Sequence, residues 1–318
     1  MIEQMIPALI AFIVVAALSP LLIAVLRKLK FLQPIRKELP SDHQLKKGTP
    51  LMFGLILFVG IITSIMFSPT SLMYFLSITY ILFSFVGFLD DFWKASRQDP
   101  NGVSGRTKLI FQFLFTGTLL YYAINYIGVD TNIHIFKDIS LDLPLILYFI
   151  IMTLFVVGSA NAINFTDGLD GLLGVVAIPS YFFFFMVSDR VEVQLFSFIM
   201  IGCLLGFLIY NIFPAKAFMG DTGSLAIGGS LAFLAVIEEV EILIPVLFFI
   251  YFAEILSVIL QVFIYKCTKK RIFKMTPIHY HFALKYKWSE NTIVMVFGFI
   301  SWVCTFACLV YWKLFLNP

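Results

Sequence analysis

Long runs of apolar residues, separated by short polar connections, dominate the chain. Ten of these runs approach the ~20 residues that an α-helix needs to cross a bilayer. They are Met5–Leu26, Leu51–Phe67, Leu72–Phe92, Leu109–Ile127, Leu143–Ala160, Leu172–Val187, Val193–Phe213, Leu225–Ile237, Ile242–Tyr265 and Ile293–Trp312. The pattern predicts an all-α integral membrane protein, a polytopic bundle of ten transmembrane helices. The eighth run is short for a full crossing, so we expect it to be tilted or partly buried by its neighbours.

The composition agrees with a chain that is membrane-embedded along its whole length. Hydrophobic residues make up 60% of the 318 residues, charged residues make up 13%, and the mean hydropathy is +0.96. A soluble domain has roughly a quarter of its residues charged, so an ordinary soluble protein is excluded. No stretch has the length and polarity of a separate soluble domain, and we expect one polytopic domain over residues 1–318. The first run has no basic residues before it, and we expect it to be retained as a span.

Basic residues gather in alternate connections between the runs. Of the 22 Lys and Arg residues, 19 fall on one side, in the connections that follow runs one, three, seven and nine. The other side holds only Lys137, Arg190 and Lys313, beside several acids. The positive-inside rule makes the basic side cytoplasmic, so both termini are predicted to be extracytoplasmic. Because one missed span would scramble the partition, it also supports the count of ten.

The connection between the fifth and sixth runs, Asn161–Gly174, has a repeated polar pattern. Four amide and carboxylate side chains follow one another at three-residue steps: Asn161, Asn164, Asp167 and Asp170. On a helical path they would line one side. Gly168 and Gly171 let the backbone bend or approach a ligand closely. Such a segment at a membrane surface suits a phosphate and its divalent metal, and the alternative is a polar loop whose aspartates cap the next helix.

Two further acidic positions adjoin the ends of runs on the same side. Asp90 and Asp91 close the third run, and Lys94 follows one helical turn later. Adjacent carboxylates at an apolar helix end indicate a metal or a cationic partner, for which Lys94 is the candidate, with a plain interfacial ion pair as the alternative. Asp221 enters the eighth run between two glycines. A glycine-rich helix start offers N–H groups to a phosphate while the carboxylate holds a metal, and the alternative is an N-cap.

Two histidines and one buried acid complete the candidate chemistry. His279 and His281 lie in MTPIHYHFAL, within the most basic connection. No third ligand for zinc lies nearby, so phosphate contact or acid–base work fits them better, with an interfacial pair as the alternative. Glu254 lies inside the ninth run, where an acid is a functional candidate. Ser257 and Gln261 at helical spacing are its expected partners if it is structural.

Four motifs together resemble those of the polyprenyl-phosphate N-acetylhexosamine-1-phosphate transferases. These motifs are NAINFTDGLDG, GFLDDFWK, AFMGDTGS and MTPIHYHF, in the order that the family has them. The likeness runs from Phe31 to the last apolar run. The M-x-P-I-H-x-H block is similar to that of the phospho-N-acetylmuramoyl-pentapeptide transferase branch. The chain departs from the family at Tyr280, which stands where the family usually has the middle of three histidines.

The resemblance implies a ten-helix fold, a reaction and a setting. The reaction moves phospho-N-acetylmuramoyl-pentapeptide from UDP-MurNAc-pentapeptide to undecaprenyl phosphate with Mg²⁺, giving lipid I and UMP. The setting is the lipid bilayer of a bacterial plasma membrane, with a cytoplasmic active site, a homodimer and no nucleic-acid partner. One alternative is a UDP-GlcNAc:undecaprenyl-phosphate GlcNAc-1-phosphate transferase for another surface polymer. The other is a transporter or flippase of an anionic lipid-linked solute, which would place its site near the midplane.

Position by position, the resemblance also implies roles for individual residues. Asp90, Asp91 and His279 would be catalytic, and Asp221 would bind the metal. The implied substrate-binding residues are Lys46, Lys47, Thr49, Arg106, Lys108, Asn164, Asp167, Asp170, Asn211, Phe218 and His281. A phosphate monoester has a second pKa of about 6, so the lipid acceptor is largely dianionic at neutral pH and needs little help from a base. Asp90 is therefore a base, a covalent nucleophile or a positioner of the attacking phosphate.

Overall fold

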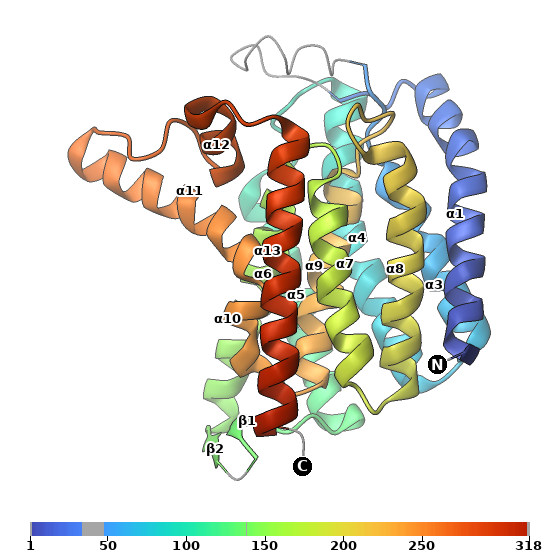
Figure 1. Cartoon of the computed structure of the whole chain (residues 1–318), viewed down its shortest axis with the longest axis vertical. Helices are drawn as coiled ribbons and strands as arrows, with labels where there is room; N and C mark the ends of the chain where they lie inside the picture. The colour runs from blue at the N-terminus through green and yellow to red at the C-terminus, as the bar shows by residue number, and fades with distance from the viewer. Residues whose placement is uncertain (1, 34–47, 138, 317–318) are drawn as a thin grey trace.

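The computed structural model describes residues 2–33, 48–137 and 139–316, so Lys46 and Lys47 lie outside the described residues. The described chain is mostly helical and forms a bundle (Figure 1). Eight of its helices are long and apolar enough to cross a membrane. They are α1 (Ile2–Lys28), α4 (Ser71–Arg97), α5 (Gly105–Tyr122), α6 (Leu145–Thr166), α8 (Val191–Asn211), α9 (Gly220–Ile237), α11 (Phe249–Thr268) and α13 (Glu290–Tyr311).

Two shorter apolar helices occupy the second and sixth predicted runs. The first is α3 (Phe58–Phe67), which continues from the 3₁₀ turn η1 (Phe53–Leu57), and the second is α7 (Leu172–Val187). Every predicted run is therefore helical, while ten complete crossings remain a prediction. The π-helical turns η2 (Ala123–Ile127) and η4 (Trp312–Leu316) extend α5 and α13.

The prediction that the ninth run, Ile242–Tyr265, forms one continuous helix is wrong. The chain forms η3 (Glu241–Leu243) and α10 (Ile244–Leu247), turns at Phe248, and only then begins α11. Figure 1 shows α11 leaving the bundle at an angle, with the short helix α12 (Ile278–Tyr286) folded back from its far end. Hydropathy alone cannot locate such a break, because the residues on both sides of it are apolar.

The two ends of the described chain lie at the same end of the bundle, and α12 lies at the opposite end (Figure 1). An even number of membrane crossings, such as the predicted ten, places both chain ends on the same side. A small antiparallel hairpin of β1 (Asn132–Phe136) and β2 (Ile139–Asp142) lies at the same end of the bundle as the two chain ends. The sequence predicts no strand here, because the two segments are only five and four residues long.

Helix α9 is the buried centre of the bundle. All of its residues except Asp221 are buried, and it packs against α4, α6, α7 and η1. Small residues recur along GDTGSLAIGGSLA, which allows neighbouring helices to approach closely. The expectation that the short eighth run is enclosed by neighbours is confirmed, although the helix begins at Gly220 rather than at Leu225.

Candidate functional site

Helix α4 approaches the first turn of α9 so closely that their main chains touch. A Cβ atom on Gly87 would overlap the carbonyl group of Asp221 and lie 2.5 Å from the backbone nitrogen of Thr222. Only glycine, which has no Cβ, allows this approach. The crossing places Asp90 and Asp91, one helical turn further along α4, beside the start of α9.

Asp91 holds the N-terminal turn of α9. Its Oδ1 accepts a hydrogen bond from the backbone nitrogen of Asp221 at 3.1 Å. Its Oδ2 accepts hydrogen bonds from the backbone nitrogen and the hydroxyl of Thr222, at 2.8 Å and 2.6 Å. The first N–H groups of a helix have no partner within the helix, and a carboxylate there also interacts favourably with the helix dipole. The capping role that was the alternative for Asp221 therefore belongs to Asp91, which supplies it from a different helix.

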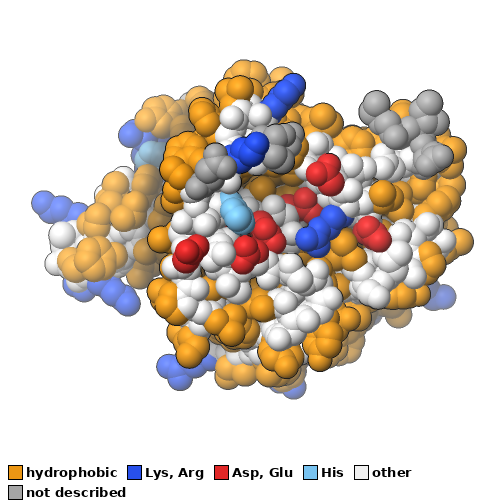
Figure 2. Space-filling model, turned by 90° about the horizontal axis from the view of Figure 1, so that it is seen from below, with side chains coloured by type: hydrophobic (Ala, Val, Ile, Leu, Met, Phe, Trp, Pro, Cys, Tyr) orange, Lys and Arg blue, Asp and Glu red, His pale blue; other side chains and the backbone are white. Residues whose placement is uncertain are grey.

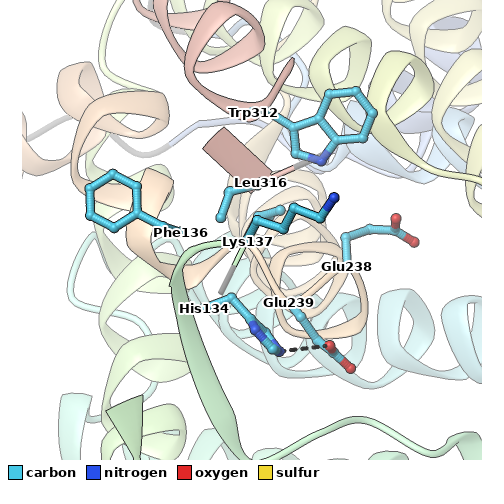
Figure 3. A pocket seen from close by; sticks show the side chains of 8 residues that line it. His134, Phe136, Lys137, Glu238, Glu239, Trp312 and Leu316 are labelled. Atoms are coloured by element: carbon cyan, nitrogen blue, oxygen red, sulfur yellow. Dashed lines mark ion pairs between the residues drawn. The ribbon is translucent and has the colours of Figure 1, made fainter. Parts of the chain in front are cut away.

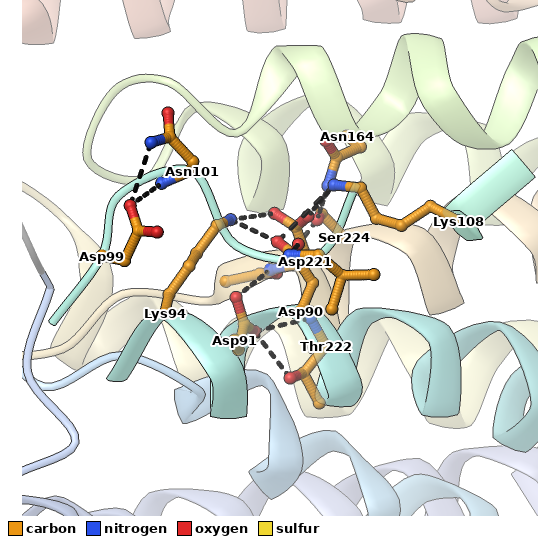
Figure 4. A network of polar contacts seen from close by, with 12 residues as sticks. Asp90, Asp91, Lys94, Asp99, Asn101, Lys108, Asn164, Asp221, Thr222 and Ser224 are labelled. Carbon is orange, nitrogen blue, oxygen red and sulfur yellow. Dashed lines mark hydrogen bonds and ion pairs between the residues drawn. The ribbon is translucent and has the colours of Figure 1, made fainter. Parts of the chain in front are cut away.

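Two lysines bridge Asp90 and Asp221 (Figure 4). The Nζ atom of Lys94 lies 2.5 Å from Asp90 Oδ2 and 3.4 Å from Asp221 Oδ1. The Nζ atom of Lys108 lies 2.9 Å from Asp221 Oδ2 and 3.5 Å from Asp90 Oδ2. Asp90 is completely buried, and its Oδ1 accepts a hydrogen bond from the backbone nitrogen of Val103 at 2.8 Å. A buried carboxylate is costly without such partners, and Lys94 is the cationic partner that the sequence predicts.

The carboxylates of Asp90, Asp91 and Asp221 fit a divalent cation. One oxygen from each of the three lies within 4.8 Å of the others. Carboxylate oxygens are the ligands that hard divalent cations take in proteins. Both oxygens of Asp221 contact lysine side chains, so a cation and the two ammonium groups would share the same oxygens.

The segment Asn161–Gly174 is not one continuous helix, because residues 167–171 form a turn between α6 and α7. Helix α6 ends at Thr166, and Gly171 takes a left-handed conformation with φ of +79° before α7 begins. The four polar residues at three-residue steps therefore do not continue along one helix, because the chain turns between the third and the fourth. The first of them, Asn161, is bonded within the bundle, since its amide donates to Gln112 Oε1 at 2.6 Å.

Asn164 and Asp167 both reach the start of α9. The amide of Asn164 donates a hydrogen bond to Ser224 Oγ at 2.8 Å. The carboxylate of Asp167 lies beside the backbone of Gly220 and the carboxylate of Asp221. Loss of water contact raises the pKa of Asp167 well above its usual range, and the neighbouring carboxylate of Asp221 raises this pKa further. These two predicted residues therefore belong to the same cluster as Asp221.

Asp170 and Asn211 tie together the connections on either side of the cluster. Asp170 Oδ2 accepts a hydrogen bond from the backbone nitrogen of Ala215 at 2.9 Å. Asn211 accepts one from the backbone nitrogen of Gly171 at 3.1 Å and donates one to the carbonyl of Ala217 at 2.9 Å. Both side chains are buried. Their contact with a substrate remains a prediction.

His279 and Glu254 form a completely buried pair. His279 Nδ1 lies 3.0 Å from Glu254 Oε1, and the backbone nitrogen of His279 donates to Glu254 Oε2 at 3.4 Å. The expectation that Ser257 and Gln261 satisfy Glu254 is wrong. The hydroxyl of Ser257 donates to the backbone carbonyl of Glu254, and Gln261 accepts hydrogen bonds from the connection after α11.

The two residues that follow His279 contact different segments. His281 Nδ1 accepts a hydrogen bond from the backbone nitrogen of Lys274 at 3.0 Å. Burial and the nearby ammonium groups of Lys285 and Lys274 lower the pKa of His281, which agrees with a neutral ring that accepts this bond. The hydroxyl of Tyr280 donates a hydrogen bond to the carbonyl of Gly168 at 3.2 Å. The tyrosine that replaces the family's middle histidine therefore links α12 to the connection before α7.

The other predicted residues lie around this cluster. The backbone of Phe218 joins two segments, because its nitrogen donates to Pro50 and its carbonyl accepts from Phe53. Its side chain is half-buried directly before α9. Thr49 is half-buried beside Pro50, and Arg106 is exposed in the first turn of α5.

The structure therefore assembles the cluster from α4, α5, α9 and the end of α6. Carboxylates and ammonium groups held together at helix ends can bind a divalent cation and phosphate oxygens, which is what phosphoryl transfer needs. Sequence reasoning missed Thr222, Ser224 and the pairing of Glu254. Hydroxyl residues directly after Asp221 in GDTGS are the signal that points to the first two.

A separate cavity opens at the end where the chain termini lie. It has a volume of about 410 Å³ and is lined by His134, Phe136, Lys137, Glu238, Glu239, Val240, Trp312 and Leu316 (Figure 3). Figure 2 shows acidic side chains gathered around a histidine on this face. His134 Nε2 lies 3.6 Å from Glu239 Oε2 and 3.8 Å from Asp130 Oδ2. None of the predicted site residues that the structure describes lines this cavity.

Comparison with known proteins gives one family and a consistent set of relatives. The sequence profile of glycosyl transferase family 4 matches residues 72–239. A phospho-N-acetylmuramoyl-pentapeptide-transferase of Clostridium beijerinckii is 41% identical over 302 residues, which cover 93% of this chain and 92% of that protein. The proteins of the same name from Bacillus subtilis and Clostridium perfringens (strain SM101) are 41% and 42% identical, and each alignment covers 93% of this chain. The two alignments cover 94% of the Bacillus protein and 93% of the Clostridium perfringens protein, respectively.

Proposed function

Because this chain belongs to glycosyl transferase family 4 and, within it, to the phospho-N-acetylmuramoyl-pentapeptide transferases, we propose that it makes lipid I. The enzyme is a phospho-sugar transferase. It transfers phospho-N-acetylmuramoyl-pentapeptide from its UDP-linked donor to undecaprenyl phosphate and releases UMP. The observation that carries the proposal is the identity of about 41% with transferases of this name along nearly the whole chain. The relatives do not favour the UDP-GlcNAc alternative, and the clustering of acids at one end of the bundle does not favour a transporter.

Mg²⁺ is the cofactor that we propose. Asp221 would hold it together with Asp90, and Asp91 supplies the third carboxylate of the group. When bound, Mg²⁺ would neutralise charge on the diphosphate of the donor. The donor set supports this choice, since it consists only of carboxylate oxygens.

The lysines and the histidine have complementary roles in the proposed reaction. Lys94 and Lys108 place two ammonium groups beside Asp221, where they can bind phosphate oxygens of the donor or of the acceptor. His279 would stabilise charge on the donor diphosphate. Asp90 is held by Val103 and by both lysines, so we assign it the role of positioning the attacking phosphate rather than that of a base.

We further propose ten membrane crossings in a bacterial plasma membrane, with both termini outside and the active site at the cytoplasmic surface. The support is the concentration of 19 of the 22 basic residues in alternate connections. The lipid acceptor lies in the membrane with its phosphate at the depth of the helix ends, and the soluble donor arrives from the cytoplasm. A homodimer is part of the proposal on the resemblance alone.

An assay with purified protein tests the function. UMP release and the lipid product are measured with undecaprenyl phosphate and either UDP-MurNAc-pentapeptide or UDP-GlcNAc, with and without Mg²⁺. We expect lipid I only with the muramoyl donor and only with the metal. Turnover of UDP-GlcNAc in place of the muramoyl donor would refute the proposal.

A further inference from the structure

Glu254 is a buried carboxylate that the proposed reaction does not yet use. It lies in α11, and its side chain is completely buried. Its two carboxylate oxygens both contact one residue, since Oε1 meets His279 Nδ1 and Oε2 meets the backbone nitrogen of His279. A carboxylate is costly to bury, so a position of this kind is usually tied to a function. Here the whole carboxylate is committed to placing one imidazole.

The other ring nitrogen of His279 faces the candidate site. Nε2 is buried and has no hydrogen-bond partner among the residues that the structure describes. It packs directly against Gly168, where a Cβ atom would overlap the imidazole. Gly168 adjoins Asp167, whose carboxylate lies beside the first residue of α9, Gly220. The unpartnered nitrogen is therefore directed at the connection that borders the acidic cluster.

We propose that Glu254 is a positioning residue for the transfer reaction, acting through His279. Its carboxylate accepts the Nδ1–H and so fixes the ring with Nε2 directed toward the connection 167–171. A carboxylate behind an imidazole orients the ring and stabilises the imidazolium, and the Nε2–H of the imidazolium can donate to an anionic oxygen. The anion is a phosphate oxygen of the nucleotide-linked donor. The inference rests on the proposed function and adds to it a residue that orients the donor contact.

A purely structural role for the pair predicts a different outcome. If Glu254 only docked α12 against α11, its loss would lower stability, and its effect on the rate would be independent of the effect of His279. A positioning role instead makes the two effects overlap, because Glu254 acts only through the imidazole. A double-mutant cycle separates these outcomes.

The first measurement is kcat and the donor KM of Glu254→Gln in the purified full-length protein. Glutamine still accepts a hydrogen bond but carries no charge. We expect kcat to fall by about 10- to 100-fold, as for other residues that orient a functional histidine, with the donor KM changed by less than about threefold. Glu241→Gln is the matched control, since Glu241 is also buried, is bonded to Tyr148, and lies in η3 away from the cluster. We expect it to retain kcat within about twofold.

The second measurement is kcat of His279→Asn and of the double variant Glu254→Gln/His279→Asn, which completes the double-mutant cycle. We expect the double variant to be no slower than His279→Asn alone. Losses that multiply, or a Glu254→Gln variant as active as Glu241→Gln, would overturn the inference. Every variant is checked for monodisperse elution and for its melting temperature. If Glu254→Gln does not fold, Glu254→Asp, which keeps the charge on a shorter side chain, enters the same cycle with the same criteria.

The outcomes distinguish the inference from the function on which it rests. If the wild-type protein makes no lipid I from the muramoyl donor, the proposed function fails. If the wild-type protein is active and Glu254→Gln is active to the same degree, only the role of Glu254 fails.

Discussion

Replacement of Gly87 by alanine tests whether the approach of α4 to α9 builds the acidic cluster. The added methyl group would overlap the carbonyl of Asp221 and lie 2.5 Å from the backbone nitrogen of Thr222. Both obstacles are main-chain atoms of a buried helix, so neither can move away as a flexible side chain would. The helices must separate, and the separation moves Asp90 and Asp91 away from the turn of α9 that Asp91 binds.

The expected cost follows from two opposing effects. Overpacking a well-packed interior costs typically about 1–3 kcal/mol, and an obstacle made of backbone atoms belongs at the upper end of that range. Alanine is favoured over glycine within a helix by about 1 kcal/mol. The net destabilisation is therefore about 2 kcal/mol, or a melting temperature lower by roughly 4–8 °C. We expect the carboxylates of Asp90 and Asp91 to be displaced by up to about 1 Å, which lowers the transfer rate by up to about 100-fold.

Gly117→Ala provides a matched control for this variant. Gly117 is also helical, but a Cβ there would meet only the ring of Phe149, at an ordinary distance of 3.8 Å. This variant gains the helix preference without the overlap, so we expect an unchanged rate and a melting temperature equal to or slightly above that of the wild type. Both variants are assayed in detergent for thermal unfolding and for UMP release. A Gly87→Ala protein as stable and as active as Gly117→Ala would refute the reasoning.

Four further predictions follow from the charges of the molecule. Cysteine probes at Ser96 and Asn132 should react from the cytoplasm and from outside, respectively, and two probes on the same side would contradict the proposed topology. Asp221→Asn should remain folded but lose Mg²⁺-dependent turnover, whereas near-normal activity at unchanged Mg²⁺ demand would contradict its assignment. Asp90→Asn should be impaired equally at pH 6 and pH 8.5. Recovery at pH 8.5 would instead identify a base, and a stoichiometric UMP burst without the lipid acceptor, absent from this variant, would identify a nucleophile. Burial raises the pKa of Glu241 from its usual 4.5 to about 7, so the folded state binds this proton more tightly than the unfolded state. The melting temperature should therefore fall as pH rises from about 4.5 through about 7, and a Glu241→Gln protein with the same pH dependence would contradict this cause.

The side of the membrane on which the cluster lies could be predicted from the sequence. Hydropathy predicts where each run ends, and the charges of the connections predict which ends share a side. The positive-inside rule puts the end of the third run and the start of the eighth run on the same side of the membrane. Asp90 and Asp221 are therefore predicted on the same side of the membrane, although 131 positions separate them in the chain. The structure brings them together, with Lys108 from the fifth helical element bridging the two.

The division of work between adjacent acids could not be predicted from the sequence. Asp90 and Asp91 have the same side chain and the same hydropathy, and only their directions from α4 distinguish them. Asp91 points at the N–H groups of α9, while Asp90 points at the lysines. The angle at which two helices cross determines these directions, and that angle depends on the packing of residues such as Gly87.

The partner of Glu254 could not be predicted for a related reason. Residues at helical spacing, Ser257 and Gln261, are the nearest candidates along the chain. The actual partner, His279, lies beyond the end of α11 and returns to Glu254 only because the connection folds α12 back (Figure 1). Local spacing describes contacts within one helix, whereas this contact depends on the path of an irregular connection.

The balance of charge in the cluster explains why a metal and an anionic substrate are expected to act together. The carboxylates of Asp90, Asp91 and Asp221 face two ammonium groups and the start of α9, which carries about half a positive charge. These groups by themselves are therefore close to neutral and offer a diphosphate little net attraction. A divalent cation on Asp90 and Asp221 would take over oxygens that the lysines now contact and would leave two ammonium groups for phosphate oxygens. On this argument, Asp221→Asn weakens donor binding and changes the Mg²⁺ requirement in the same variant, because one carboxylate serves both.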